Sequence, residues 1–304
     1  MRSFEVTILG SGAALPTITR NPTAQFIRCK NRHILIDCGE GTQSQLRKFK
    51  CKLQQIDFIL ISHLHGDHFF GLVGLLSSMH LLGRTKSVKL FAHAPLKSII
   101  MSQLEIGGAR LDFDIDFQEI KGDESKLLFE DKCIEIHAFP LKHRIETNGF
   151  LIKEKQMPLS LDGDKFKEDK LPLIAIPFFK RNENFINDKG ERFNVSDYTF
   201  PAPKAKSYAY CSDTAYLPVI AAMCTGADLM YHEATFTEIH ADKAKKTNHS
   251  TAIQAATIGK LCNVKQLLLG HFSARYASTK EHLAEAQTIF EAVNCVEDGD
   301  VFKV

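Results

Sequence analysis

Four side chains of types that bind metals lie within six residues of one another, directly after an apolar run typical of a buried strand. They are His63, His65, Asp67 and His68. Functional groups commonly lie on loops where strands end. A turn through Gly66 would let the two earlier side chains converge on one ion while the two later ones reach a second. A lone histidine is usually an ordinary core or surface residue, but four ligands at this HxHxDH spacing predict a metal site.

Four fragments further along the chain also place polar residues after strand-like runs. They are Pro140–His143, Cys211–Thr214, Tyr231–Thr235 and Leu268–His271. Adding His143, Asp213 and His271 to the first cluster supplies mainly imidazole and carboxylate ligands, which suit two zinc ions, and Asp213 is able to bridge them. Glu233, in the remaining fragment, is then free for proton transfer.

The elements that must position these residues alternate between β-rich and helical patterns. Strands are expected at 4–9, 24–28, 33–37, 58–62, 88–91, 134–137, 149–152, 207–211, 229–231 and 266–269, and helices at 43–50, 69–82, 217–223, 251–261 and 281–293. Two sheet-rich halves with helices outside predict an α/β fold, a four-layer αββα sandwich formed by residues 1–304 as one domain.

The segment of about 154–206 differs from the rest because lysines and arginines alternate with prolines and acidic residues. It is interpreted as an inserted arm or long excursion outside the core. Gly10-Ser11-Gly12 begins like a dinucleotide fingerprint, but the third glycine and the following helix are absent, so these glycines are assigned to a tight turn.

The composition of the chain excludes several classes of protein. The chain is 44% hydrophobic and 24% charged, as in ordinary globular proteins, and no window approaches the ~20 apolar residues of a membrane span. A net charge of +2 does not by itself indicate a nucleic-acid partner. The chain begins with a strand pattern and no apolar signal region, which predicts a cytoplasmic protein. Eight scattered cysteines without a CxxC pair predict reduced, buried thiols.

The HxHxDH stretch with the downstream His, Asp and His resembles the metallo-β-lactamase superfamily. The HEAT fragment His232–Thr235 and the NHST fragment Asn248–Thr251 are similar to those of its ribonuclease Z (tRNase Z) branch, and the resemblance extends from Gly10 to Ser273. It implies a zinc-dependent endoribonuclease that cleaves precursor tRNA on its 3′ side, leaving a 3′-hydroxyl on the tRNA and a 5′-phosphate on the trailer.

The resemblance also implies residue roles. One zinc would be held by His63, His65 and His143, the other by Asp67, His68 and His271, with Asp213 between them. Asp67 would also orient or deprotonate the attacking water, and His249, fixed by Glu233, would protonate the departing oxygen. Manganese or iron could replace zinc, and the family resemblance implies a homodimer.

Substrate contacts are predicted where the chain partly departs from the family. The loop 16–21 resembles a PxKxRN loop near the substrate's end, with Arg20 and Asn21 present but Ile18 in place of the lysine. In the arm, Ala175–Arg181 stands where the family has a Gly-Pro motif. Lys180 and Arg181 would contact phosphates there, unless the segment is only a solvated loop. Ser273 is a further candidate contact.

Phe69 and Phe70 are assigned to the core of the helix at 69–82 rather than to base stacking.

Two rival functions remain open. One is another binuclear hydrolase of the same fold, a phosphodiesterase, arylsulfatase, thioesterase or lactonase. The other is a non-catalytic tRNA- or metal-binding protein. The HEAT and NHST fragments and the basic arm favour RNA cleavage.

Overall fold

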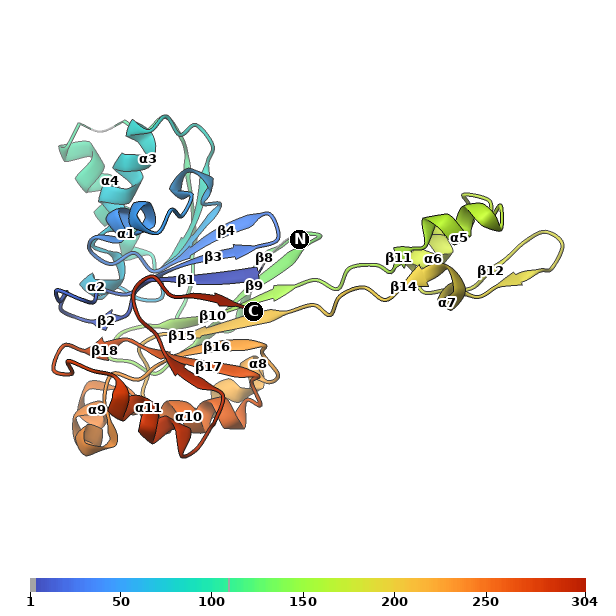
Figure 1. The fold of residues 1–304 in the computed structure, drawn as a ribbon. Coiled ribbons are helices and arrows are strands. Elements are labelled where there is room, and N and C mark those ends of the chain that lie inside the picture. The colour runs from blue at the N-terminus through green and yellow to red at the C-terminus, as the bar shows by residue number, and fades with distance from the viewer. Residues whose placement is uncertain (1–3, 109) are drawn as a thin grey trace. The chain divides into compact units, whose positions relative to one another are not determined.

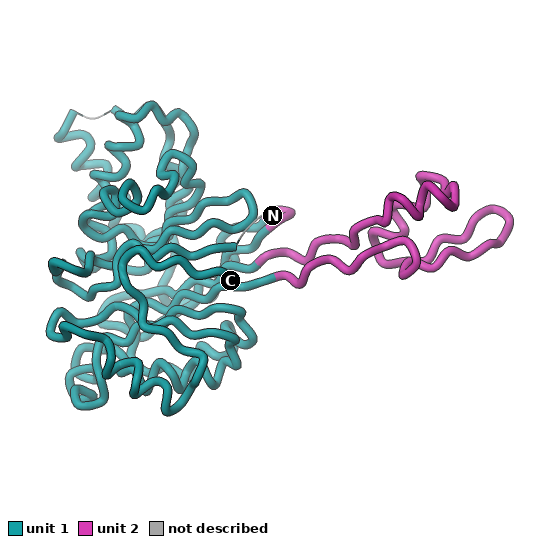
Figure 2. The backbone as a smooth tube through the Cα atoms, viewed as in Figure 1, with its two compact units in different colours: residues 1–130, 134–153, 206–304 teal, residues 131–133, 154–205 magenta. Residues whose placement is uncertain are grey.

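The computed structural model of the protein describes residues 4–108 and 110–304, so residues 1–3 and 109 of the expected domain lie outside the described part. The chain divides into two compact units, coloured separately in Figure 2. The first comprises residues 1–130, 134–153 and 206–304, and the second comprises residues 131–133 and 154–205.

Two large sheets form the centre of the first unit. Within the described residues, the first sheet has the strand order β20 (Val301–Lys303), β1 (Phe4–Gly10), β3 (Ala24–Cys29), β4 (Arg32–Ile36), β5 (Phe58–Leu60), β6 (Val88–Ala92) and β7 (Ile115–Glu119). The second has the order β19 (Val293–Cys295), β17 (Gln266–Gly270), β16 (Leu229–Glu233), β15 (Ser207–Cys211), β10 (Asn148–Glu154), β9 (Ile134–Pro140) and β8 (Lys126–Glu130). A short parallel pair, β2 (Gly12–Ala13) and β18 (Phe272–Ser273), lies beside them.

Helices cover the outer faces of both sheets, as Figure 1 shows for α1, α3 and α4 on one side and α9, α10 and α11 on the other. Their bounds are α1 Thr42–Lys48, α3 Leu72–Leu81, α4 Pro95–Ile106, α9 Ala241–Thr247, α10 Ala252–Leu261 and α11 Lys280–Gln287. The short α2 (Gly66–Phe69) and α8 (Ala221–Cys224) lie in loops. Strands β5 and β16 are buried at every residue because they are covered on both faces. The predicted four-layer αββα fold is confirmed.

Two helix predictions were wrong in their bounds. The helix expected at 69–82 begins only at Leu72. Gly71 donates its N–H to the Cys38 carbonyl at 2.9 Å, which holds the chain against the neighbouring loop. The helix expected at 281–293 ends at Gln287, and Val293 begins β19. Helix α4 was not predicted, although Pro95 at its first position is a start signal.

The cysteines are reduced thiols, and six of them are buried, as predicted. Among the described residues, no helix combines the length and the apolar character needed to cross a bilayer.

The second unit has its own small core. Its elements are β11 (Ser160–Leu161), α5 (Gly163–Glu168), α6 (Ala175–Lys180), β12 (Phe185–Ile186), β13 (Arg192–Phe193), α7 (Val195–Tyr198) and β14 (Thr199–Phe200). Phe179 is fully buried and stacks on Tyr198 with ring centroids 5.3 Å apart, and Phe166 and Phe185 pack in the same cluster. A packed aromatic cluster distinguishes this segment from a solvated loop.

Candidate metal centre

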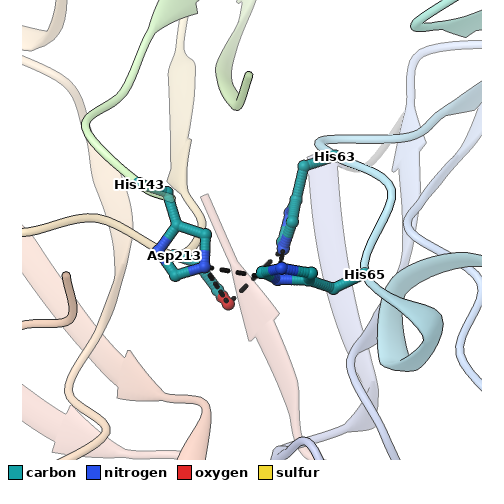
Figure 3. Close-up of side chains that lie close together, drawn as sticks. All are labelled: His63, His65, His143 and Asp213. Carbon is teal, nitrogen blue, oxygen red and sulfur yellow. Dashed lines mark hydrogen bonds and ion pairs between the residues drawn. The ribbon is translucent and has the colours of Figure 1, made fainter. Parts of the chain in front are cut away.

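The sequence-predicted ligands come together at the ends of strands from both sheets. His63 follows β5, His143 follows β9, Asp213 follows β15 and His271 follows β17. Ligand sites in α/β proteins commonly lie beyond the carboxyl ends of strands, and here two such edges face each other. Figure 3 shows four of these side chains pointing toward a common centre.

The first group joins three imidazoles and one carboxylate. Nε2 of His63 and Nε2 of His143 lie 3.0 and 3.3 Å from Nδ1 of His65. The same two Nε2 atoms lie 3.5 and 3.7 Å from Oδ2 of Asp213. Ligand atoms of a tetrahedral ion with bonds near 2.0–2.1 Å are separated by about 3.3 Å, so this group has the dimensions of such a site.

The second group surrounds the other side of Asp213. Its Oδ1 lies 3.4 Å from Nε2 of His68 and 3.2 Å from Nε2 of His271. Oδ2 of Asp67 lies 3.5 and 3.4 Å from the same two nitrogens. Each oxygen of Asp213 therefore faces a different group, as a carboxylate that bridges two ions would.

Buried atoms without partners support a cation in this place. Nε2 of His68 and Oδ1 of Asp213 are buried and have no hydrogen-bond partner among the described residues, a costly arrangement unless an ion satisfies them.

Burial, with His68 alongside, lowers the pKa of His63 to about 3, which leaves its imidazole neutral and able to bind metal. Burial also lowers the pKa of His68, but Asp213 and Asp67 outweigh it and hold the pKa well above its ordinary value. The excess negative charge that raises this pKa would equally favour a metal cation, and the cluster fits a binuclear metal site.

Outer hydrogen bonds orient the imidazoles. Nδ1 of His68 lies 2.8 Å from Oδ2 of Asp37, which also accepts hydrogen bonds from the Ser62 and Tyr210 hydroxyls. Nδ1 of His143 donates to the Asn248 carbonyl at 2.9 Å. These bonds direct the Nε2 atoms into the centre. Asp37 was not predicted, and its only sequence signal is a carboxylate directly after a buried strand.

Glu233 and His249 form a pair beside the centre. Nδ1 of His249 lies 2.8 Å from Oε1 of Glu233. The buried Glu233 carboxylate also accepts from the Thr214 N–H and from the N–H and hydroxyl of Thr235. Burial lowers the pKa of His249, but the Glu233 carboxylate outweighs it and raises the pKa to about 9. His249 is therefore protonated near neutral pH, as a proton donor must be.

His249 also lies close enough to Asp213 and His271 to form a third possible ligand group within the described ranges. A cavity of about 480 Å³ opens over part of the cluster. Its lining includes His65, Asp67, Asp213, His249 and His271, together with Gly66, Phe70, Arg144, Phe236 and Ser273.

Of the predicted substrate-binding residues outside the arm, one lines the cavity and two are bound to other segments of the chain. Ser273 lines the cavity. Arg20, in contrast, is buried and donates to the Tyr276 carbonyl at 2.8 Å, so its guanidinium links the loop at 16–21 to the segment that follows β18. Asn21 donates its backbone and side-chain N–H groups to Asp298 at 2.8 and 2.9 Å, which ties the loop to the segment before β20.

The predicted arm cations lie on the surface of the second unit. Lys180 is exposed at the end of α6. Arg181 donates to both carboxylate oxygens of Glu183 and lies over the ring of Phe178 at 5.0 Å. Its partner Glu183 offsets part of the charge that it would offer to a phosphate.

Comparison with known proteins decides the family. Residues 4–175 match a family model described as the anti-Pycsar protein Apyc1. The matched range includes HxHxDH and His143 but ends before Asp213. Ribonuclease Z of Phocaeicola vulgatus is 41% identical over 290 residues, covering 95% of this chain and 94% of that protein. Ribonuclease Z of Parabacteroides distasonis is 40% identical over 299 residues, 98% of each chain. These relatives span the second half of the site as well.

The chain belongs to the ribonuclease Z family. Its fold agrees with that of the short form of human tRNase Z, with a TM-score of 0.71 and 30% identity over 98% of each chain. The metallo-β-lactamase fold protein YhfI from Bacillus subtilis, 17% identical with a TM-score of 0.69, shares the fold. As a ribonuclease Z, the protein is a hydrolytic endoribonuclease of tRNA 3′ processing, which confirms the activity predicted from HxHxDH, HEAT and NHST.

Proposed function

We propose that this ribonuclease Z uses two zinc ions to cleave precursor tRNA directly, leaving a 3′-hydroxyl on the tRNA and a 5′-phosphate on the trailer. The observation that carries the proposal is the pair of ligand groups that share Asp213, beside the Glu233–His249 pair. Mapping the cut in an end-labelled precursor tRNA to single-nucleotide resolution, with the chemistry of both new ends determined, tests it. A cut that leaves a 3′-phosphate would contradict it.

Zinc is favoured by the chemistry of the ligand groups. They are dominated by imidazole, and the spacing of their atoms fits tetrahedral coordination. One ion would be held by His63, His65 and His143, the other by Asp67, His68 and His271, with Asp213 shared. Bound in pairs, such ions supply a water acidic enough to attack phosphorus at neutral pH. Manganese or iron in the same ligands is the alternative that metal analysis of the purified protein decides.

The chain's own residues would handle the protons. Asp67 lies at the mouth of the centre with Oδ2 toward His68 and His271, where it would orient the attacking water and accept its proton. His249 would donate its proton to the departing 3′ oxygen of the tRNA. Glu233 would hold the imidazole in its protonated form and in one orientation, since it accepts four hydrogen bonds that fix its own position.

A role of His249 as a metal ligand is the competing assignment, because it lies near Asp213 and His271. Its bond to Glu233 favours proton donation, since Nδ1 is already engaged. The two roles separate in a single variant, because removing a ligand lowers metal content whereas removing an acid lowers turnover alone.

The second unit is proposed as the tRNA-binding arm of a single-domain enzyme. Its own aromatic core gives it a defined surface, and Lys180 is exposed on it. Contacts there would be made to the phosphate backbone of the tRNA and would read its shape rather than its sequence.

We also propose that the enzyme is a homodimer and works in the cytoplasm. The family resemblance supports the dimer, which light scattering of the purified protein tests. The reduced cysteine thiols support a reducing compartment. Fractionation of cells that express the tagged chain tests the location.

A further inference from the structure

The ring of Phe70 is exposed beside the metal centre, whereas that of Phe69 packs against the core of the first sheet. Phe70 is 68% exposed, and it lines the cavity together with His65, Asp67 and His249. Phe69 is partly buried against the hydrophobic cluster that includes Leu72 and Leu76. The assignment of both rings to a helix core was therefore wrong for Phe70, because α2 ends before it and α3 begins after it.

The backbone around Phe70 is held in place even though the ring is exposed. Its N–H donates to the Gly66 carbonyl at 2.9 Å. The next residue, Gly71, donates to the Cys38 carbonyl at 2.9 Å, and the Cys38 N–H donates to the His68 carbonyl at 2.7 Å. Gly71 has no room for a side chain, because a Cβ there would lie 2.1 Å from the Gly39 carbonyl oxygen. An exposed ring on such a fixed backbone loses little freedom when a ligand covers it.

One side of the ring lies on the metal-binding loop itself. A Cβ at Gly66 would come within 2.1 Å of the Phe70 ring, so the glycine of HxHGDH gives the ring its place. Gly66 stands between His65 and Asp67, which belong to the two different ligand groups. The ring therefore forms a wall of the cavity within a few residues of the atoms that would hold the scissile phosphate.

We propose that Phe70 stacks on a nucleobase adjoining the scissile phosphate and so positions the RNA for cleavage. This inference rests on the proposed function. An unpaired base offers a flat face to an aromatic ring, and such stacking tolerates any base, which suits an enzyme that must cut next to different sequences. The cavity of about 480 Å³ lies within the size range of small-ligand pockets. Covering this exposed apolar ring with substrate would also remove apolar surface from water, which favours binding.

The test compares Phe70→Ala, Phe70→Leu and Phe70→Tyr on precursor tRNA under single-turnover and steady-state conditions. Phe70→Ala should lower kcat/KM by roughly 5- to 150-fold, mainly through KM, the reduction expected for one base stack. Phe70→Leu should show most of this reduction, because it keeps apolar bulk without a ring face, and Phe70→Tyr should restore activity close to the parent. Leu81→Ala, at an apolar position that is even more exposed (81%) at the end of α3, is the matched control and should leave kcat/KM unchanged.

Abasic substrates identify the base. Precursor tRNAs that lack the base either immediately 5′ or immediately 3′ of the cut should be prepared. On one of them, parent and Phe70→Ala should be equally active, while on the other the variant keeps its full defect. Equal defects on both abasic substrates and on normal RNA would overturn the stacking role, as would unaltered cleavage by Phe70→Leu and Phe70→Ala. A parent enzyme that fails to cut normal precursor tRNA would overturn the proposed function itself, which separates the two failures.

Discussion

The backbone N–H of Ala14 donates a 2.8 Å hydrogen bond to Oδ2 of Asp67, the same oxygen that faces Nε2 of His68 and of His271. Ala14 has a φ of 56°, in the left-handed region that non-glycine residues seldom occupy, so the surrounding loop imposes this conformation. A loop from the start of the chain thus fixes a carboxylate of the metal centre. The contacts that hold this loop in place therefore also determine the position of the Asp67 carboxylate.

Asp298 is the main anchor of that loop. It accepts five hydrogen bonds, two from Ser11, two from Asn21 and one from Gln45. Asp298→Ala should lower the free energy of unfolding by about 2–4 kcal/mol, because buried donors lose a charged acceptor. It should also lower turnover, because Asp67 is held less firmly. Urea denaturation and cleavage assays measure both. Asp300→Ala, which removes a carboxylate with one exposed partner, is the control, and an equal effect of both variants would refute the anchoring role.

Asp37 should control metal affinity without binding metal. Because its carboxylate orients His68, Asp37→Asn should weaken metal binding by roughly 10- to 100-fold. Competition with a chelator, followed by elemental analysis, gives the affinity. Asp57→Asn changes another buried carboxylate of the same sheet and should leave metal binding intact. Unaltered metal retention by the Asp37 variant would show that the His68 ring needs no such support.

His249→Ala should separate chemistry from metal binding. Loss of a general acid should lower turnover by roughly 10²- to 10⁴-fold, while two ions per chain remain bound. His137→Ala, at a half-buried histidine on β9 paired with Glu135, is the control and should retain activity. If the His249 variant loses an ion, the residue is a ligand, in keeping with its approach to Asp213 and His271.

The arm should contribute binding and not chemistry. Lys180→Ala combined with Arg181→Ala should weaken precursor tRNA binding and reduce the slope of log affinity against log salt by about 0.7–0.9 for each phosphate that is no longer neutralised. Glu183→Ala should have the opposite effect, because it frees Arg181 from its carboxylate partner. Hydrolysis of bis-p-nitrophenyl phosphate should be unaffected in every variant. A salt titration identical to that of the parent would leave the two cations without a role.

His282 should make the fold sensitive to mild acid. Burial, together with Arg20, lowers its pKa to about 4, so the unfolded chain, with the ordinary value near 6.5, binds the proton more readily. Stability is therefore complete above about pH 6.5 and declines as the pH falls toward 4, by up to about 3 kcal/mol from this residue. His282→Leu should show a smaller decline over this window in urea titrations. An identical pH dependence would show that His282 titrates normally in the folded protein.

Residue type and spacing were sufficient for the core of the site. All seven predicted ligands come together because they lie in four segments that each follow a strand, and strand ends are recognisable as apolar runs that stop at polar residues. The roles of Asp37 and Asp298 were not predicted, because a single aspartate is not part of a recognisable motif and both residues act through contacts that are distant in sequence. The burial of Arg20 was not predicted because its motif says nothing about burial, and its guanidinium lies against Tyr276 and Phe272. Phe70 was misplaced because helical periodicity continued across a break that the Gly71–Cys38 contact imposes.

The shared carboxylate of Asp213 has a consequence for how the enzyme would acquire its ions. One buried side chain presents an oxygen to each ligand group, so an ion at either position would restrict the orientation of the carboxylate at the other. Affinity at the two positions must then be coupled, and by thermodynamic reciprocity each ion alters the affinity for the other by the same factor. A titration of the metal-free protein would measure this coupling through the amount of singly occupied enzyme that accumulates.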